Sequence, residues 1–199
     1  MTELSELLVQ LESAWETHGF SCPRWLAPGI DHALAREAIA SVSGAPCQEA
    51  LDWFGWHNGS IDDHTEVELA PSGFTLLSIE QSLAERAFRI EGAMALADLP
   101  PDPLPVSVFW HDSWLPIGRI STAAVLVVDL AADATAAPVY NVDWQDLTSS
   151  GVPATPSLAD AVRVWLSVLV GGYYKWAEGF WHYDFSAVPK EFRRSRLVG

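Results

Sequence analysis

The stretch Trp53-Phe54-Gly55-Trp56-His57-Asn58-Gly59 joins an aromatic run to two residues that favour turns. Each aromatic side chain can bury about 150–250 Å² of surface, so the run predicts the end of a buried helix. Asn58-Gly59 tolerates positive φ and predicts a sharp reversal directly after that helix. The stretch contains no reaction chemistry, and its value lies in what it predicts about the fold.

Three helices are predicted up to this stretch. Apolar residues at helical spacing give a first amphipathic helix that ends at His18-Gly19. A good N-cap residue begins the second helix, over Asp31–Ser43. The third helix opens at Pro46 and carries Trp53 and Phe54 inward.

A polar segment follows the stretch, and a short strand and a helix are predicted after it. Residues 60–73 are polar and acidic and predict a loop or a solvent-facing hairpin. Phe74–Leu77 predicts a short strand, and Ser78 with Gln81 forms a capping box that opens another helix. A proline-rich linker then covers residues 99–105.

The second half of the chain predicts strands followed by one long helix. β-branched and aromatic runs lie at residues 106–110, 115–117, 125–130 and 139–142. The run at 125–128 is apolar on both faces, so we expect it to be the central strand. Ser157 with Asp160 opens the last helix, whose apolar stripe is expected to continue to Tyr173 and Trp176 and to cover the sheet.

Helices at both ends of a run of strands predict the α+β class. We expect a single domain, with an antiparallel or mixed sheet of about four to six strands packed against N-terminal and C-terminal helices. This domain, with an N-terminal helical extension, is expected over residues 1–185, and a basic C-terminal tail over residues 186–199.

The charge distribution indicates which kinds of partner the chain can bind. The tail carries +3 and the rest of the chain −18, which together give the net charge of −15. An acidic body repels phosphate backbones, which argues against direct nucleic-acid binding, and it attracts a basic partner. The alternative is that the acidic surface only keeps the protein soluble.

Cysteine use and hydropathy indicate a cytoplasmic protein. Cys22 and Cys47 stand in no metal-ligand pattern, and two reduced thiols are a simpler interpretation than one disulfide. The acidic start of the chain does not resemble a signal peptide. No apolar run reaches the ~18 residues of a membrane span.

The motifs of common catalytic sites are absent: the nucleophile elbow, the phosphate loop and the zinc motifs. His111-Asp112, or His182 with Asp184, could supply base chemistry, and the acidic loop at residues 62–68 could bind a cation. Surface or structural roles are the simpler interpretation of all three. We therefore expect no catalytic residue, no metal and no cofactor.

Tryptophans outside the helical core stripes are candidates for contact with a partner. Trp56, Trp114 and Trp181 are of this kind, and exposed indoles mark either a carbohydrate platform or, more commonly, a protein contact. The partner-binding residues that we predict are Trp56, His57, Asp62, Asp63, Glu66 and Glu68.

A series of short motifs follows one order along residues 30–170. The motifs are Ala45-Pro46, Asn58-Gly59, Phe74-Thr75-Leu76-Leu77-Ser78-Ile79-Glu80, Trp114-Leu115-Pro116-Ile117, Val127-Val128-Asp129-Leu130 and Pro138-Val139-Tyr140-Asn141. In this order and spacing they resemble the SMI1/KNR4 family, also called the SUKH superfamily. The chain departs from the family at Ala45, where Leu is usual, and at Arg119–Ala123, where the family often has an acidic turn.

The resemblance implies an α+β domain that binds protein rather than catalysing a reaction. Bacterial members are similar to immunity proteins that neutralise toxins, often nucleases, and fungal members resemble regulators of cell-wall synthesis. The family pattern marks mostly scaffold positions: Trp53, Asn58, Gly59, Trp114, Pro116 and Asp129. Resemblance and charge together predict a non-catalytic intracellular module that binds a basic toxin. An intracellular regulatory scaffold and a small hydrolase or metal-dependent enzyme are the alternatives.

Overall fold

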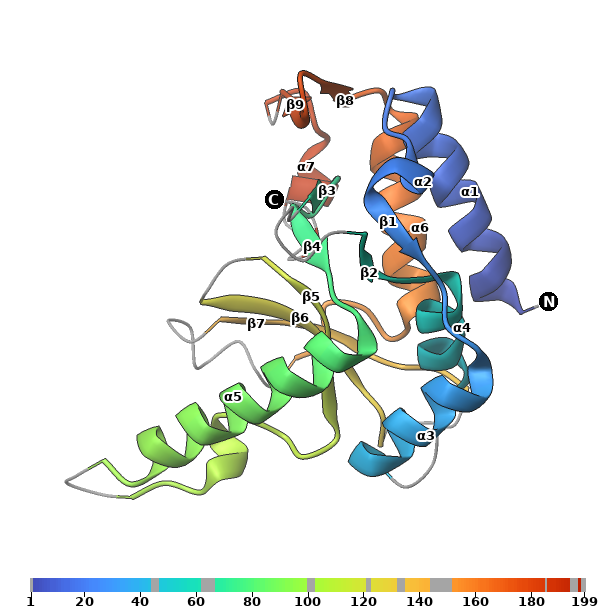
Figure 1. The fold of residues 1–199 in the computed structure, drawn as a ribbon. Helices are drawn as coiled ribbons and strands as arrows, with labels where there is room; N and C mark the ends of the chain where they lie inside the picture. Colours follow the sequence, from blue (N-terminus) through green and yellow to red (C-terminus); the bar gives the residue numbers. More distant parts are fainter. Residues whose placement is uncertain are drawn as a thin grey trace.

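The structure is a computed structural model of the 199-residue chain. It describes residues 2–43, 47–61, 67–99, 103–120, 123–131, 135–143, 152–184, 186–193 and 197. Its α-helices, labelled in Figure 1, are α1 (Glu3–Thr17), α2 (Cys22–Trp25), α3 (His32–Ser43), α4 (Gln48–Trp56), α5 (Ile79–Ala97), α6 (Leu158–Val170) and α7 (Lys190–Arg193). A 3₁₀ helix, η1, covers Val106–Val108. Its strands are β1 (Leu26–Pro28), β2 (His57–Ser60), β3 (Glu68–Leu69), β4 (Phe74–Leu76), β5 (Trp114–Arg119), β6 (Ala124–Asp129), β7 (Val139–Asp143), β8 (Tyr174–Ala177) and β9 (Phe180–Tyr183).

The described strands form one main sheet and two short two-stranded sheets. The main sheet has the order β3-β4-β5-β6-β7, and every neighbouring pair is antiparallel. β6 pairs with both β5 and β7, so the run predicted as central is an interior strand. β1 pairs with β2, and β8 with β9. The predicted α+β class, with a single domain and an antiparallel sheet, is confirmed.

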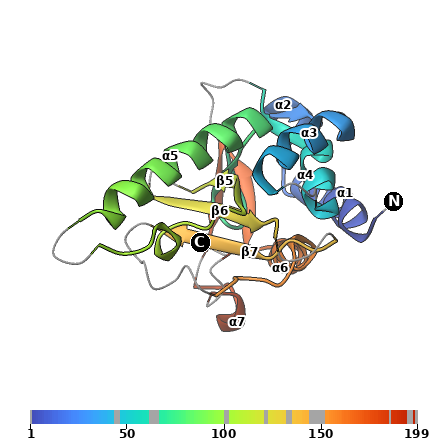
Figure 2. The same cartoon turned by 90° about the horizontal axis from the view of Figure 1, so that it is seen from below.

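Helices cover both faces of the sheet, and alternation along β6 divides the core between them. Val125 and Val127 pack with Ala93 and Ala97 of α5 on one face. Leu126 and Val128 face the larger cluster built from α1, α4 and α6. Figure 2 shows α5 and α6 on opposite sides of the strands. A strand buried on both faces explains the continuous apolar run in the sequence.

Several predicted helix starts are confirmed by their caps. Ser78 and Gln81 form the capping box of α5. The Ser157 side chain accepts a hydrogen bond from the Asp160 N–H at the start of α6. Before α3, Asp31 Oδ1 accepts from the Ala33 N–H at 2.7 Å. These local signals place the helices correctly because each cap satisfies backbone donors that the helix itself leaves free.

The predicted turn at Asn58-Gly59 is wrong, because both residues lie in strand β2. Gly59 does have a positive φ of 82°, but it lies within the strand. Glycine also fits here because a Cβ would lie 2.8 Å from the Ser78 nitrogen. Asn58 Oδ1 accepts from the Ile79 N–H at 2.8 Å. The two residues therefore join β2 to the start of α5 instead of reversing the chain.

Two further predicted elements are corrected by tertiary packing. The strand expected at residues 106–110 is the 3₁₀ helix η1 and the turn after it, where Phe109 and Trp110 fill the α5 side of the core. The stripe expected to continue to Tyr173 and Trp176 stops with α6 at Val170, and Trp176 lies in β8. In both places the apolar side chains are buried by tertiary contacts, although the backbone does not adopt the predicted secondary structure.

The polar segment and the basic tail are more deeply packed than the sequence suggests. Val67, Leu69 and Ala70 are buried, although residues 60–73 are predicted to face solvent. In the C-terminal segment, Val188 and Leu197 are buried, and the Leu197 carbonyl accepts a hydrogen bond from Trp165 Nε1 at 3.0 Å. The described part of residues 186–199 thus packs onto the domain.

Candidate functional site

The predicted contact residues separate into three groups in the structure. Asp62, Asp63 and Glu66 lie outside the described residues. Glu68 is exposed on β3, at the edge of the sheet. Trp56 and His57 are half-buried where α4 passes into β2. Their roles as contacts stay predictions, but their positions show which surfaces they border.

Trp56 and His57 meet Glu12 of α1, a residue that no sequence motif singles out. Trp56 Nε1 donates a hydrogen bond to Glu12 Oε1. His57 Nε2 lies 3.2 Å from the same oxygen, and His57 Nδ1 lies 2.8 Å from the Ala27 carbonyl oxygen. His57 thus lies between the carboxylate of α1 and the backbone carbonyl of β1. Hydrogen bonding to His57, followed by the Trp56 contact, keeps the pKa of Glu12 below its ordinary value despite partial burial.

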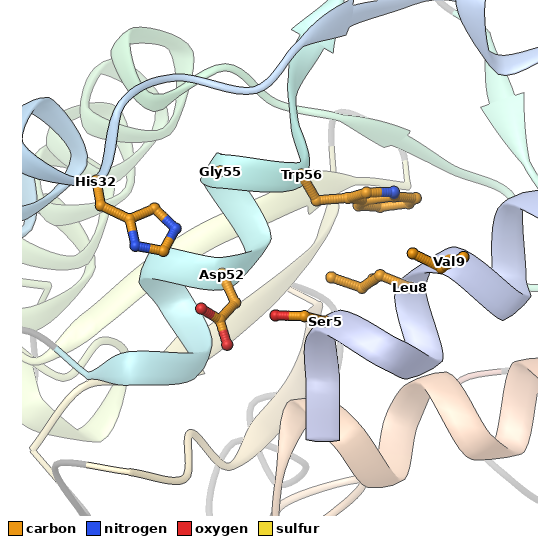
Figure 3. Close-up of a pocket in the computed structure, with 7 residues that line it drawn as sticks. All are labelled: Ser5, Leu8, Val9, His32, Asp52, Gly55 and Trp56. Carbon is orange, nitrogen blue, oxygen red and sulfur yellow. The ribbon is translucent and has the colours of Figure 1, made fainter. Parts of the chain in front are cut away.

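A hollow of about 200 Å³ lies between α1 and α4, and Figure 3 shows it in close-up. Its lining residues are Ser5, Leu8, Val9, His32, Asp52, Gly55 and Trp56. The Trp56 indole lies over Leu8 and Val9 (Figure 3). Gly55 lets His32 approach the α4 backbone, since a Cβ there would be 2.6 Å from His32 Nε2. The apolar part of the hollow is therefore an indole face and two aliphatic side chains.

Ser5, His32 and Asp52 are the residue types of a hydrolase triad, but their connections are not those of a triad. Asp52 accepts from Gln48 Nε2 at 2.8 Å and from Thr2 Oγ1. The Ser5 hydroxyl lies 2.8 Å from Thr2 Oγ1. Among the described residues, no hydrogen bond joins His32 to Ser5 or Asp52. A relay requires a base bonded to the nucleophile and held by the acid, and this arrangement does not provide one.

A second hollow, of about 380 Å³, adjoins the first at Asp52. It is lined by Thr2, Glu3, Leu4, Gln48, Glu49, Asp52, Thr135, Ala136, Ser157 and Ala159. We call the two together the α1 groove. Its described lining contains the carboxylates of Glu3, Glu49 and Asp52 and no Lys or Arg.

Glu49 connects the groove to the start of α6. Its side chain is only 8% exposed and accepts the N–H groups of Ala137, Leu158 and Ala159 at 2.7, 3.0 and 3.1 Å. A carboxylate is stabilised there by free donors and by the helix dipole. Sequence reasoning missed Glu49 and Asp52, although two acids in an otherwise apolar helix were a signal of specific partners.

The outer face of α1 extends the acidic character of the groove. Glu3, Glu6 and Glu16 are exposed, and the helix contains no Lys or Arg. Val9, which lines the groove, is 57% exposed. Within the described residues, Arg163 of α6 pairs with Glu3 and Asp160, and this pairing raises the pKa of Arg163.

A third hollow, of about 340 Å³, lies between β3 and the β8–β9 hairpin. Its lining residues are Val67, Glu68, Trp176, Gly179, Phe180 and Trp181. We call it the hairpin hollow. Of the three tryptophans predicted to be free of the core, Trp56 and Trp181 line hollows, whereas Trp114 is 1% exposed and packs against Trp110 and Tyr140.

The positions that the family pattern marks have structural roles. Trp53 is fully buried. Pro116 lies in β5 beside an irregularity in its pairing with β6, where a missing N–H is tolerated. Asp129 Oδ1 accepts from the Ala131 N–H at 3.0 Å. Together with Asn58, Gly59 and Trp114, these residues contribute to the packing and hydrogen bonding of the fold.

The other predicted chemistry is not assembled in the described parts of the chain. His111 and Asp112 are exposed, and His111 contacts the Trp114 ring at 4.6 Å. His182 is exposed on β9, while Asp184 accepts bonds from Ser186 that lower the pKa of its carboxyl. No group of three or more His, Cys, Asp or Glu residues able to hold a metal ion occurs among the described residues. The cation site expected at residues 62–68 falls largely outside them.

With this geometry in view, the chain was compared with known proteins. No protein-family model matches it, and no curated protein matches its sequence. The resemblance to the SMI1/KNR4 family therefore stays a prediction. None of the described helices is both long enough and apolar enough to cross a membrane.

Proposed function

We propose that this chain is a non-catalytic, cytoplasmic protein-binding module whose partner is basic, in the manner of an immunity protein that neutralises a nuclease-type toxin. The α1 groove carries the proposal. Its carboxylates are set beside an apolar floor of Leu8, Val9 and Trp56, and its described lining holds no Lys or Arg. Lys and Arg side chains fit such a surface because their stems bury on apolar groups while their charges meet acids.

Net charge supports the choice of a basic partner. The whole chain carries −15, and α1 itself contains no Lys or Arg; of its acids, Glu3 pairs with Arg163 of α6. A toxin that cleaves nucleic acid needs a basic surface to hold phosphates. An acidic inhibitor accelerates encounter with that surface and then covers it.

The apolar part of the groove supplies the contact that charge alone does not. Trp56 is held in place by stacking on Trp15 at 5.7 Å and by its hydrogen bond to Glu12. A half-buried, fixed tryptophan beside an exposed valine has the character of an interface hot spot. Charge then sets the rate of association, and this apolar contact sets the lifetime of the complex.

Co-expression with the toxin encoded beside this chain tests the proposal. We expect wild-type protein to protect the cells and to form a complex with the toxin in vitro. Val9→Glu, which places a charge on the apolar floor, should abolish both effects. Met94→Glu changes an equally exposed residue on α5, with 54% exposure against 57%, and should leave them intact. Absence of protection and of a complex with wild-type protein would reject the proposal.

The acidic loop at residues 62–68 is a separate prediction within the same proposal. Of its acids, Glu68 is described and exposed. Replacement of Asp62, Asp63, Glu66 and Glu68 together by the amides should slow association with the toxin at low salt. An unchanged association rate would remove the loop from the contact surface and leave the α1 groove as the proposed site.

A further inference from the structure

The hairpin hollow lies at the opposite end of α1 from the α1 groove. The Trp176 N–H donates to the His18 carbonyl at 2.9 Å, which ties the hairpin to the C-terminal end of α1. Figure 1 shows β8 and β9 near β3 and far from the N-terminus. The groove, in contrast, is lined by residues from the first half of α1. The two surfaces are therefore separate.

The aromatic walls of the hairpin hollow are held in place by the core. The rings of Trp176 and Trp181 meet at 5.5 Å and 69°. Phe20, which is 1% exposed, packs edge-on against Trp176 at 4.9 Å and stacks on Trp181 at 5.6 Å. Trp25 supports Trp176 from a further direction at 5.7 Å. Walls that are already ordered lose little entropy when a ligand enters.

The hairpin turn places Phe180 beside the hollow. Glu178 and Gly179 both have positive φ, at 57° and 91°, as a two-residue hairpin turn requires. Phe180 follows directly, lines the hollow and is 52% exposed. Its ring lies on the hairpin face of Lys175 and His182 and contacts the His182 ring at 4.3 Å, so it borders the hollow without adding to its aromatic walls.

Glu68 gives the hollow a negative charge. It is exposed on β3, and no hydrogen bond or ion pair engages its carboxylate among the described residues. Lys175 does not face the hollow from the hairpin, because it pairs with His182 on the face opposite to Trp176 and Trp181. The described lining thus combines the two indoles with one carboxylate and contains no Lys or Arg.

We propose that the hairpin hollow binds an organic cation, an ammonium or guanidinium group carried on an alkyl chain. Aromatic faces attract such groups through their quadrupole, and a carboxylate at the rim adds a charge-assisted contact. A neutral sugar would also stack on indoles, but it would leave the charge of Glu68 uncompensated. The proposal does not depend on the proposed function, because the hollow is distinct from the α1 groove.

Fluorine NMR of the full chain labelled with 5-fluorotryptophan tests this proposal, with the Trp181 signal assigned from Trp181→Phe. The probes are tetramethylammonium, the N-acetyl methylamides of lysine and arginine, the neutral norleucine analogue and methyl glucoside. The cations should shift the Trp181 signal saturably, and the two neutral probes should not. Tighter binding of the amino-acid amides than of tetramethylammonium identifies a protein side chain as the ligand, and the reverse order identifies a free amine.

Two variants complete the test. Glu68→Gln should raise the Kd of the cations about tenfold, while Glu91→Gln, which removes the same charge from exposed α5, should leave it within about twofold. Equal shifts with the norleucine analogue or the sugar would overturn the proposal, as would an unchanged Kd in Glu68→Gln.

Discussion

Replacement of Glu49 by alanine is expected to lower the free energy of unfolding by about 2–4 kcal/mol. The side chain is 8% exposed and accepts three backbone N–H groups, from Ala137, Leu158 and Ala159. Each buried donor left without a partner costs about 1–3 kcal/mol. The three costs do not add in full, because Glu49 and Ala159 line a hollow of about 380 Å³ that admits water to the start of α6.

The loss therefore comes mainly from the Ala137 N–H and from the interaction of the carboxylate with the α6 dipole, which is worth up to about 2 kcal/mol in partly buried sites. Glu49→Gln retains one acceptor oxygen and should lose about half as much. Urea denaturation followed by circular dichroism at neutral pH measures both. Glu37→Ala, an exposed glutamate within α3, is the matched control and should change stability by less than about 0.5 kcal/mol. An equal, small effect in Glu49→Ala would refute the role assigned to this carboxylate.

Three other outcomes follow from local geometry. Folding lowers the pKa of Glu12 below its ordinary value of 4.5, so the ionised carboxylate stabilises the folded protein above pH 4.5. This stabilisation is lost as the pH falls through the folded pKa. Glu12→Gln should therefore remove that part of the acid-denaturation curve. Burial, with the charges of Glu12 and Glu16, raises the pKa of Cys22 to about 12. The Cys22 thiol should therefore react with a disulfide reagent at pH 8 only after denaturant is added. Rapid reaction of Cys22 in the folded protein would contradict this. Gly59→Ala should cost about 2–4 kcal/mol in a denaturation curve, because φ is 82° and the added Cβ would lie 2.8 Å from the Ser78 nitrogen; a near-neutral effect would show that β2 can move away.

Local signals in the sequence were sufficient for the starts of α3, α5 and α6 and for the class of fold. The caps at Ser78 and Ser157 act within one helical turn, so one sequence displays both partners of each contact. The strand β6 was recognisable because burial on both faces leaves an uninterrupted apolar run. Two predictions, at Asn58-Gly59 and at residues 106–110, are wrong because an element distant in the sequence determines the backbone conformation there. Asn58 and Gly59 lie in a strand because β1 pairs with β2. At residues 106–110, packing against α5 buries Phe109 and Trp110.

The candidate sites depended even more on long-range packing. Trp56 was identified as a contact residue from its position beside the helix stripe, and it does line a hollow. The groove itself could not be predicted, because α1, α4 and α6 come together from distant parts of the chain. Likewise, Glu68 and the tryptophans of the β8–β9 hairpin line one hollow although they are more than 100 positions apart in the chain. Local sequence spacing cannot predict such an arrangement.

The association rate with the basic toxin encoded beside this chain tests the central claim most directly. Glu6→Gln/Glu16→Gln removes two exposed charges from α1, and Glu37→Gln/Glu91→Gln removes the same number from α3 and α5. At low salt we predict that the α1 variant associates about fivefold more slowly than wild type, that the control stays close to wild type, and that the difference vanishes at high salt. Equal rates for the two variants at low salt would contradict the claim that the acidic face of α1 receives a basic partner.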